Sequence, residues 1–311
     1  VYLAGGTSSE STGGRVVIQS GFSSSTTSGI ILMRTPNSGS NGVSGFIALS
    51  TGVSSLGNSG GLYFGTADAS DGRGGVISMT VGSGDSGSGG DIIFTAGSTS
   101  DSPAGATGGQ VYLSGGTSAS QTGGRVAIRS GVGADTTSGA VAITTANSGT
   151  NGVSGAIVMS TGKSFRGNSG ALHLGSGVAA SGRGGSIAVT VGAGNSGSGG
   201  NVEVNAGGTS ASAVGGDVIL SGGTSATHTG GRVLIHSGSS TLQSSGSVEI
   251  FTADSGNNGG VTGLITLSTG VADTGNSGGL YLGTGTAAGT GRAGSVSLTV
   301  GSGSSGSGGD I

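Results

Sequence analysis

Apolar residues recur along the chain in pairs that are two residues apart, and each pair opens a new unit of a repeat. Val16 and Ile18 form one pair, and Leu172 and Leu174 form another. Side chains two residues apart lie on the same face of an extended strand. No stretch of the chain shows the 3.6-residue spacing of an amphipathic helix. The pattern therefore predicts short β-strands, each with two apolar side chains on one face.

The pairs follow one another at a nearly fixed period. Their first members stand at residues 1, 16, 31, 47, 62, 77, 92, 111, 126, 141, 157, 172, 187, 202, 218, 233, 248, 265, 280, 296 and 311, which is 20 steps over 310 residues. A fixed short period is the signature of a repeat architecture in which successive units stack. We therefore expect an all-β fold: a parallel β-solenoid of 21 strands, with about 15 residues per coil and backbone hydrogen bonds between coils.

Two positions of the unit favour glycine. The first corner, two residues before the first apolar residue, is Gly in all 20 units that contain it. The second corner, five residues after the first apolar residue, is Gly except at Pro36, Ala67, Ala146 and Ala253. Glycine is selected where φ is positive or where another backbone leaves no room for a Cβ. The expected structural glycines of the first corner begin with Gly14, Gly29, Gly45, Gly60, Gly75, Gly90, Gly109, Gly124, Gly139 and Gly155.

The residue before the second corner, which we call the pre-corner position, is always small or β-branched. It holds only Gly, Ser, Thr, Ala or Val, for example Thr35, Thr51 and Thr66 in three successive units. This restriction indicates a tight corner that stacks on its copies in neighbouring coils.

A longer period is superimposed on the short one, because every seventh unit is a near copy. Gly14 to Ile18 reads GRVVI, and it returns as GRVAI at 124–128 and as GRVLI at 231–235. The chain therefore divides into three super-repeats, 1–110, 111–217 and 218–311. Since Val1 and Ile311 occupy the same position of the unit, we expect a segment of a longer array or a protomer that stacks end to end.

The residue between the two apolar positions points outward in this scheme, yet it is often apolar. A large apolar patch on a surface usually marks an interface. The expected interface residues at this outward position are Tyr2, Leu32, Tyr63, Ile93, Tyr112 and Tyr281.

Composition excludes several classes of protein. The chain has 77 Gly, 57 Ser and 34 Thr among 311 residues, with 2 Pro, 0 Cys and 7% charged residues. Two prolines exclude collagen, and the branched apolar residues exclude a flexible linker. A net charge of −3 offers no basic surface for nucleic acid or for an anionic membrane. The absence of Cys leaves the redox compartment open, and the many Ser and Thr residues leave room for O-glycans.

The candidate chemical motifs are better explained as parts of the repeat. The spacing of Gly82, Gly84 and Gly87, which recurs at 192–197 and 301–306, matches a dinucleotide fingerprint but lacks the helix that binds phosphate. The string GDSG at 84–87 resembles a serine-protease neighbourhood, but its super-repeat copies lack the Asp, and the chain has only three histidines. The sequence thus predicts no catalytic site, no cofactor site and no enzyme activity.

The sequence gives equally little support for a metal site or an ice-binding site. Gly-Gly-Asp at 89–91, 215–217 and 308–310 is similar to calcium-binding β-roll repeats, but the Asp occurs in too few units to build an oxygen cage. Calcium therefore stays open only as a weak alternative. His173, His228 and His236 occupy positions that do not predict a metal site. Rows of Thr suggest ice binding, although they cover only about three units in seven.

The strings GGRVAIRSG, GNSGALHLGSG and GRGGSIAVTVGAGNSGSGGNV resemble the long Gly/Ser/Thr arrays of surface proteins of heterokont (stramenopile) algae. The resemblance covers the whole chain. It implies an extracellular structural protein of tubular flagellar hairs (mastigonemes) or of a similar surface filament, packed against itself or related proteins by stacking and lateral contacts. It carries no catalytic residues over. The alternative interpretation is an adhesin-like rod that binds a ligand, such as a glycan.

Overall fold

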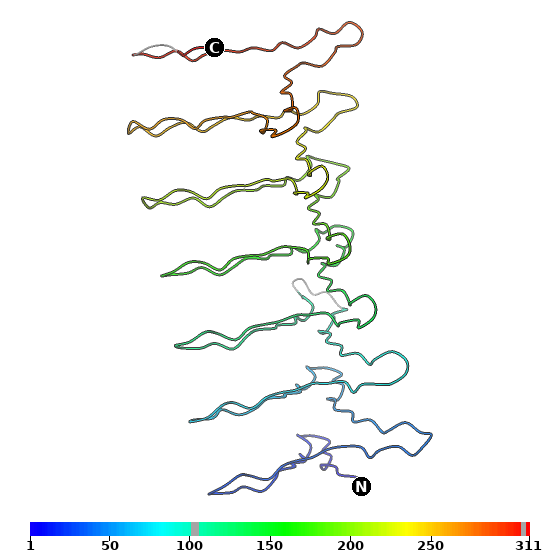
Figure 1. Ribbon diagram of the computed structural model, residues 1–311. Helices are drawn as coiled ribbons and strands as arrows, with labels where there is room; N and C mark the ends of the chain where they lie inside the picture. The colour runs from blue at the N-terminus through cyan, green and yellow to red at the C-terminus, as the bar shows by residue number, and fades with distance from the viewer. Residues whose placement is uncertain (101–105, 306–308) are drawn as a thin grey trace. The chain divides into compact units, whose positions relative to one another are not determined.

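The computed structural model describes residues 1–100, 106–305 and 309–311. Within these residues the chain forms neither helix nor strand. The predicted all-β fold, a parallel β-solenoid of 21 strands, is therefore wrong for this structure. The chain instead alternates between extended segments and bends (Figure 1).

The physical reason lies in the backbone hydrogen bonds. A strand requires a series of bonds along two neighbouring segments. In the described part of the chain, backbone bonds close single loops and short turns, and none joins two extended segments along their length. The sequence period specifies where the chain extends and where it bends. It does not specify which segment pairs with which, because nearly identical glycine-rich units define register poorly.

The chain divides into two compact units, Val1–Val158 and Met159–Ile311. In the first unit the chain bends at 9–11, 24–26, 40–41, 55–57, 70–72 and 85–87, and then at 119–121, 134–136 and 150–151. In the second it bends at 165–167, 180–182, 195–197, 210–213, 226–228, 241–243, 257–259, 273–275, 289–290 and 304–305. Each bend falls between two successive apolar pairs, so the 15-residue unit is one extended segment and one loop.

Each loop brings its two ends together. The first corner of one unit therefore lies against the pre-corner residue and the second corner of the unit before it. An ideal Cβ built on the first-corner glycine would lie only 2.8 to 3.6 Å from its nearest neighbour, in every one of the 20 units. That neighbour belongs to the pre-corner position or to the second corner of the preceding unit. None of these glycines has a positive φ. The invariant glycine therefore serves a close approach across its own loop, and not a left-handed turn.

The size of the pre-corner residue determines how the loop closes. Where it is Gly, Ala or Ser, the first-corner N–H donates to the second-corner carbonyl at 2.7 to 3.0 Å, in the pairs 14/6, 29/21, 109/97, 124/116, 139/131, 216/207, 231/223 and 246/238. Where it is Thr or Val, the described chain has no such bond, and the branched side chain faces the glycine instead. Ser176 is the exception, because its hydroxyl donates to the Gly185 carbonyl at 2.9 Å without the backbone bond.

Serine side chains stabilise several bends by accepting hydrogen bonds from backbone N–H groups of the same loop. The Ser8 hydroxyl oxygen accepts a hydrogen bond from the N–H of Ser11 at 3.0 Å. Equivalent bonds of 3.0 Å run from Gln121 to Ser118 and from His228 to Ser225. A serine hydroxyl that bonds the backbone three residues on is a common turn device. These bonds explain why Ser recurs seven residues after the first apolar residue.

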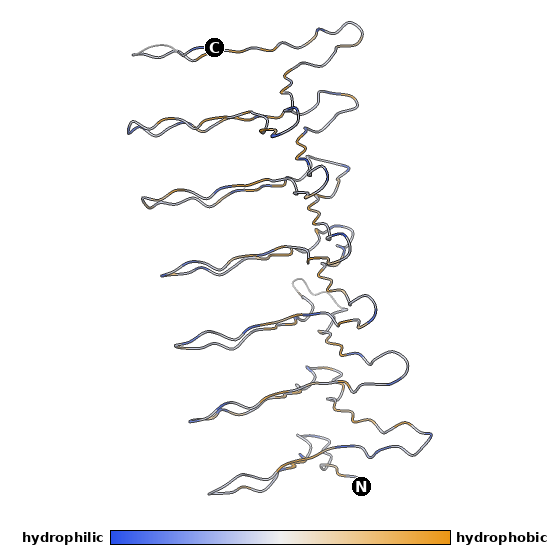
Figure 2. Cartoon of the chain, viewed as in Figure 1, coloured by the Kyte–Doolittle hydropathy of each residue, from blue (hydrophilic) through white to orange (hydrophobic). Residues whose placement is uncertain are grey.

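No described side chain is buried, so the structure has no hydrophobic core in its described part. Figure 2 shows apolar residues spread along the extended segments rather than gathered in one place. The residues with partial cover are mostly at the pre-corner position, namely Gly5, Ser20, Thr35, Ala96, Gly115, Gly222, Ser237 and Thr252, together with Ser23 and Gly133. The described chain is therefore best packed where the pre-corner residue meets the first-corner glycine of the next unit.

Candidate interaction surface

The candidate site is the set of apolar side chains carried by the extended segments. In the segment that begins at Leu62, that residue is 54% exposed, Tyr63 is 92% exposed and Phe64 is 67% exposed. The segment that begins at Val218 repeats this order, since Ile219 at its centre is the most exposed of the three. The central side chain therefore projects furthest into solvent, and the two flanking ones are also more than half exposed.

The tyrosines lie back along their own segments. A Cβ on Gly61 would come within 2.9 Å of the Tyr63 ring, and a Cβ on Gly279 would come within 2.9 Å of the Tyr281 ring. Tyr112 donates a hydrogen bond from its hydroxyl to Oε1 of Gln110. Each ring thus covers the residue two positions before it and leaves its other face open. The remaining expected interface residues, Tyr2, Leu32 and Ile93, are also exposed.

The second corner differs from the first in its surroundings. At all 16 second-corner glycines, a Cβ would meet nothing within 4 Å. None of these glycines has a positive φ. Neither crowding nor backbone conformation within the chain therefore accounts for glycine at this position.

Threonine hydroxyls at the pre-corner position are used inside the loops. Thr35 donates to the Gly45 carbonyl at 3.1 Å, Thr66 to the Gly75 carbonyl at 3.4 Å and Thr284 to the Gly294 carbonyl at 3.3 Å. A row that orders ice needs its hydroxyls directed at water. In three of the eight units with a pre-corner Thr, the hydroxyl is therefore directed at the first-corner carbonyl of its own loop.

The dinucleotide-like glycines lie in bends. Gly87 and Gly197 have φ of 76° and 73°, while Gly82 and Gly84 have ordinary φ. Asp85 and Ser86 share the bend at 85–87, and no helix follows within the described residues. Gly306, the last glycine of the third copy, lies outside the described residues. The spacing reflects a left-handed bend residue that recurs once per super-repeat, at 87 and 197.

The candidate metal residues do not come together in the described part of the chain. No group of three His, Asp or Glu side chains there is placed to hold an ion. His228 Nδ1 lies 2.8 Å from the Thr227 hydroxyl, and His236 Nδ1 lies 3.3 Å from the Ser237 carbonyl. Of the three Gly-Gly-Asp segments, Gly308 lies outside the described residues.

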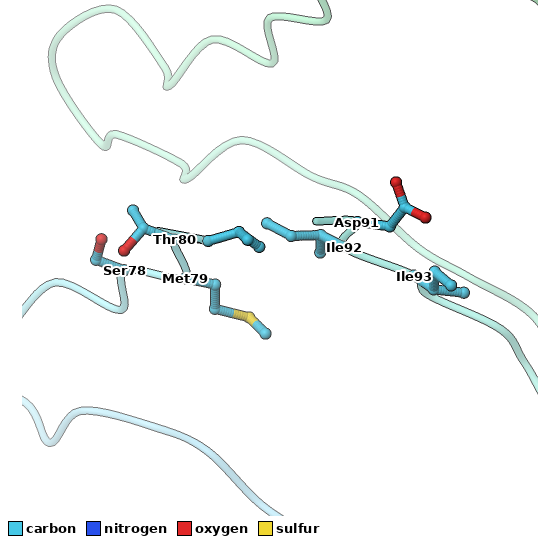
Figure 3. A pocket seen from close by; sticks show the side chains of 7 residues that line it. Ser78, Met79, Thr80, Asp91, Ile92 and Ile93 are labelled. Carbon is cyan, nitrogen blue, oxygen red and sulfur yellow. The ribbon is translucent and has the colours of Figure 1, made fainter. Parts of the chain in front are cut away.

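A hollow beside the loop at 82–90 is lined by two successive extended segments (Figure 3). Its lining residues are Ser78, Met79, Thr80, Val81, Asp91, Ile92 and Ile93. Figure 3 shows Ser78 on the first segment and Asp91 on the second, apart from each other, with the Asp91 carboxylate directed away from Ile92. The hydroxyl and the carboxylate therefore do not form a nucleophile and base pair.

Comparison with known proteins gives no relative: no protein-family model, curated protein or solved structure matches this chain. The described residues also contain no helix with the length and apolarity that a membrane span requires.

The sequence did not reveal how the loops close, although the signal was present. The pre-corner column separates into small residues, such as Gly5 and Ala96, and branched ones, such as Thr51 and Val81. Apart from Ser176, that division follows the seven-unit period and coincides with the presence or absence of the backbone bond. Side-chain volume at this one position is therefore the sequence signal for loop closure.

Proposed function

We propose that the chain is a structural component of an extracellular filament or surface appendage, assembled by lateral packing of chains. The observation that supports this proposal most directly is the exposure of apolar side chains at the outward position, including Tyr2, Tyr63 and Tyr281. Surfaces of this kind usually mark interfaces. The stacking of solenoid coils is not part of the proposal, because the chain forms no strands in its described residues.

The composition fits a material more closely than a catalyst. Only 7% of the residues are charged, and the net charge of −3 produces little repulsion between chains that pack side by side. The extracellular location and the comparison to flagellar hairs rest on the resemblance to heterokont surface arrays. Related structural proteins and O-glycans belong to the same proposal.

Electron microscopy of the purified chain, followed by analytical ultracentrifugation, tests the proposal. Filaments or long laterally packed assemblies at micromolar concentration are the expected result. A stable monomer with these apolar side chains in water would overturn it. If such a monomer bound a component of a glycan array, the adhesin-like alternative would replace the filament role.

A further inference from the structure

The chain exposes far more surface than a folded protein of its mass. Its accessible surface is 30584 Å² for 28.5 kDa. A folded monomer of this mass exposes about 11,000 Å², and the unfolded chain exposes about 41,000 Å². The excess of about 19,000 Å² is more than ten times the roughly 1,600 Å² buried in a standard protein interface. Covering it requires partners along the whole length of the chain.

The extended segments also have free hydrogen-bonding capacity. The described backbone bonds lie at the corners and bends, for example between Gly29 and Gly21, and not along segments such as 16–19. Their N–H and C=O groups alternate along an open edge. Another extended backbone satisfies both kinds of group in alternation, which is how exposed edges recruit additional chains.

The second-corner position keeps glycine although the chain itself does not require it there. Sixteen of 20 units have Gly at the second corner. A Cβ built on any of these 16 glycines would have no neighbour within 4 Å, and none of the 16 has a positive φ. Three of the four exceptions, Ala67, Ala146 and Ala253, add only a methyl group, and the fourth, Pro36, adds a ring. Glycine that the chain itself does not require is expected where a second backbone comes into contact.

We propose that a second copy of this chain packs along the extended segments, with its backbone against the column of second-corner glycines. The inference rests on the proposed function and identifies the partner within it. A partner has to present apolar side chains and an open backbone at a 15-residue period for about 300 residues. This chain has that period itself. Its 10 basic and 13 acidic residues are too few to prevent copies from approaching.

The test places side chains at second-corner glycines, which form the proposed contact line with the backbone of the partner. The variant Gly52→Val, Gly162→Val and Gly270→Val changes one second corner in each super-repeat. None of the three has a neighbour within 4 Å of its Cβ, and none belongs to a loop closed by the backbone bond. The control is Gly39→Val, Gly149→Val and Gly256→Val, which changes the residue directly before one bend in each super-repeat, where a Cβ also meets nothing within 4 Å.

Sedimentation and electron microscopy of the full chains, mixed with no other protein, measure the critical concentration for assembly. We expect wild type and control to assemble alike, and the second-corner variant to need at least a tenfold higher concentration. Circular dichroism of the dilute chains verifies that both variants keep the wild-type conformation. Equal assembly by variant and control would overturn the contact line while leaving the filament role intact. If the wild type did not assemble, the proposed function would fail as well.

Discussion

The amide N–H of Gly14 donates a hydrogen bond to the carbonyl oxygen of Gly6, with 2.7 Å between nitrogen and oxygen. The same bond joins Gly124 to Gly116 at 2.7 Å and Gly231 to Gly223 at 2.8 Å. It links the first corner of one unit to the second corner of the unit before. A backbone bond of this kind contributes about 1 kcal/mol net. Sequence positions that repeat at 110 and 107 residues thus share one local geometry.

Substituting the pre-corner glycine is expected to open this loop. A Cβ on Gly115 would lie 2.1 Å from the carbonyl oxygen of Gly124, which is too close for any contact. Gly115→Val adds this Cβ together with the branched side chain found in the loops without the backbone bond, and should therefore separate Gly124 from Gly116. Losing the bond, worth about 1 kcal/mol, should raise the exchange rate of the Gly124 amide about fivefold. Hydrogen exchange of the dilute chain, followed by mass spectrometry, measures this change.

The matched control is Gly116→Val in the same loop, where a Cβ meets nothing within 4 Å. Its exchange at Gly124 should stay at the wild-type rate when the chain is dilute. Unchanged exchange in Gly115→Val would show that the loop adapts to the added side chain.

The relation between the size of the pre-corner residue and the backbone bond predicts the effect of a single added methyl group at that position. Ser20 donates its hydroxyl to the Gly29 carbonyl at 2.9 Å, while the Gly29 N–H donates to the Gly21 carbonyl at 2.9 Å. Ser20→Thr keeps the hydroxyl but introduces the branched side chain found in loops without the backbone bond. We expect faster amide exchange at Gly29, measured as above.

Ser20→Ala distinguishes the two bonds of that loop. It removes the hydroxyl but retains a small side chain, as at Ala96, whose loop is closed by the bond from Gly109 to Gly97 at 2.8 Å. Protection of the Gly29 amide should therefore persist in Ser20→Ala. If both variants lost protection equally, side-chain size would not be the cause.

The sequence predicted the local features of the unit but not its pairing. The apolar pairs, such as Val16 and Ile18, lie in extended segments, and the first-corner glycines lie where a Cβ has no room. These features depend on residues within about 15 positions of one another. Pairing between segments depends on register, which units that differ as little as GRVVI and GRVAI do not define. The predicted strands failed at that step.

The alternation of side chains predicted which positions point outward, and their role as an interface stays a prediction. Tyr63 and Tyr281 are both 92% exposed, as their outward position suggested. What the alternation did not indicate was that the flanking positions, for example Leu62 and Phe64, are also more than half exposed. A strand pattern implies one covered face only if another segment of the same chain covers it.

Stability should depend on the concentration of the chain. Because no described side chain is buried, unfolding of the isolated chain would expose little additional apolar surface. In the proposed assembly, apolar surface is buried between chains. By mass action, the thermal midpoint of the assembled chain should therefore rise with concentration. Calorimetry over a hundredfold range of concentration should show a transition that strengthens and moves to higher temperature. A midpoint that did not change with concentration would contradict the absence of a core within one chain.

The tyrosines provide an intrinsic reporter of the interface. The chain has 4 Tyr and 0 Trp, and Tyr2, Tyr63, Tyr112 and Tyr281 all occupy the outward position. Their exposures of 91%, 92%, 80% and 92% leave the rings open to a dissolved quencher. Aromatic side chains that become buried between partners are shielded from it. Acrylamide quenching of tyrosine emission should therefore fall several-fold when the chain assembles.

A loop reporter provides the control. In a variant with all four tyrosines replaced by Phe, Leu56→Tyr places a single tyrosine at a bend residue that is fully exposed in the wild type. Because the bends lie away from the extended segments, its quenching should stay high in assemblies. Equal protection of the bend tyrosine and the native ones would indicate general aggregation. Protection confined to the native tyrosines would place the contact on the extended segments.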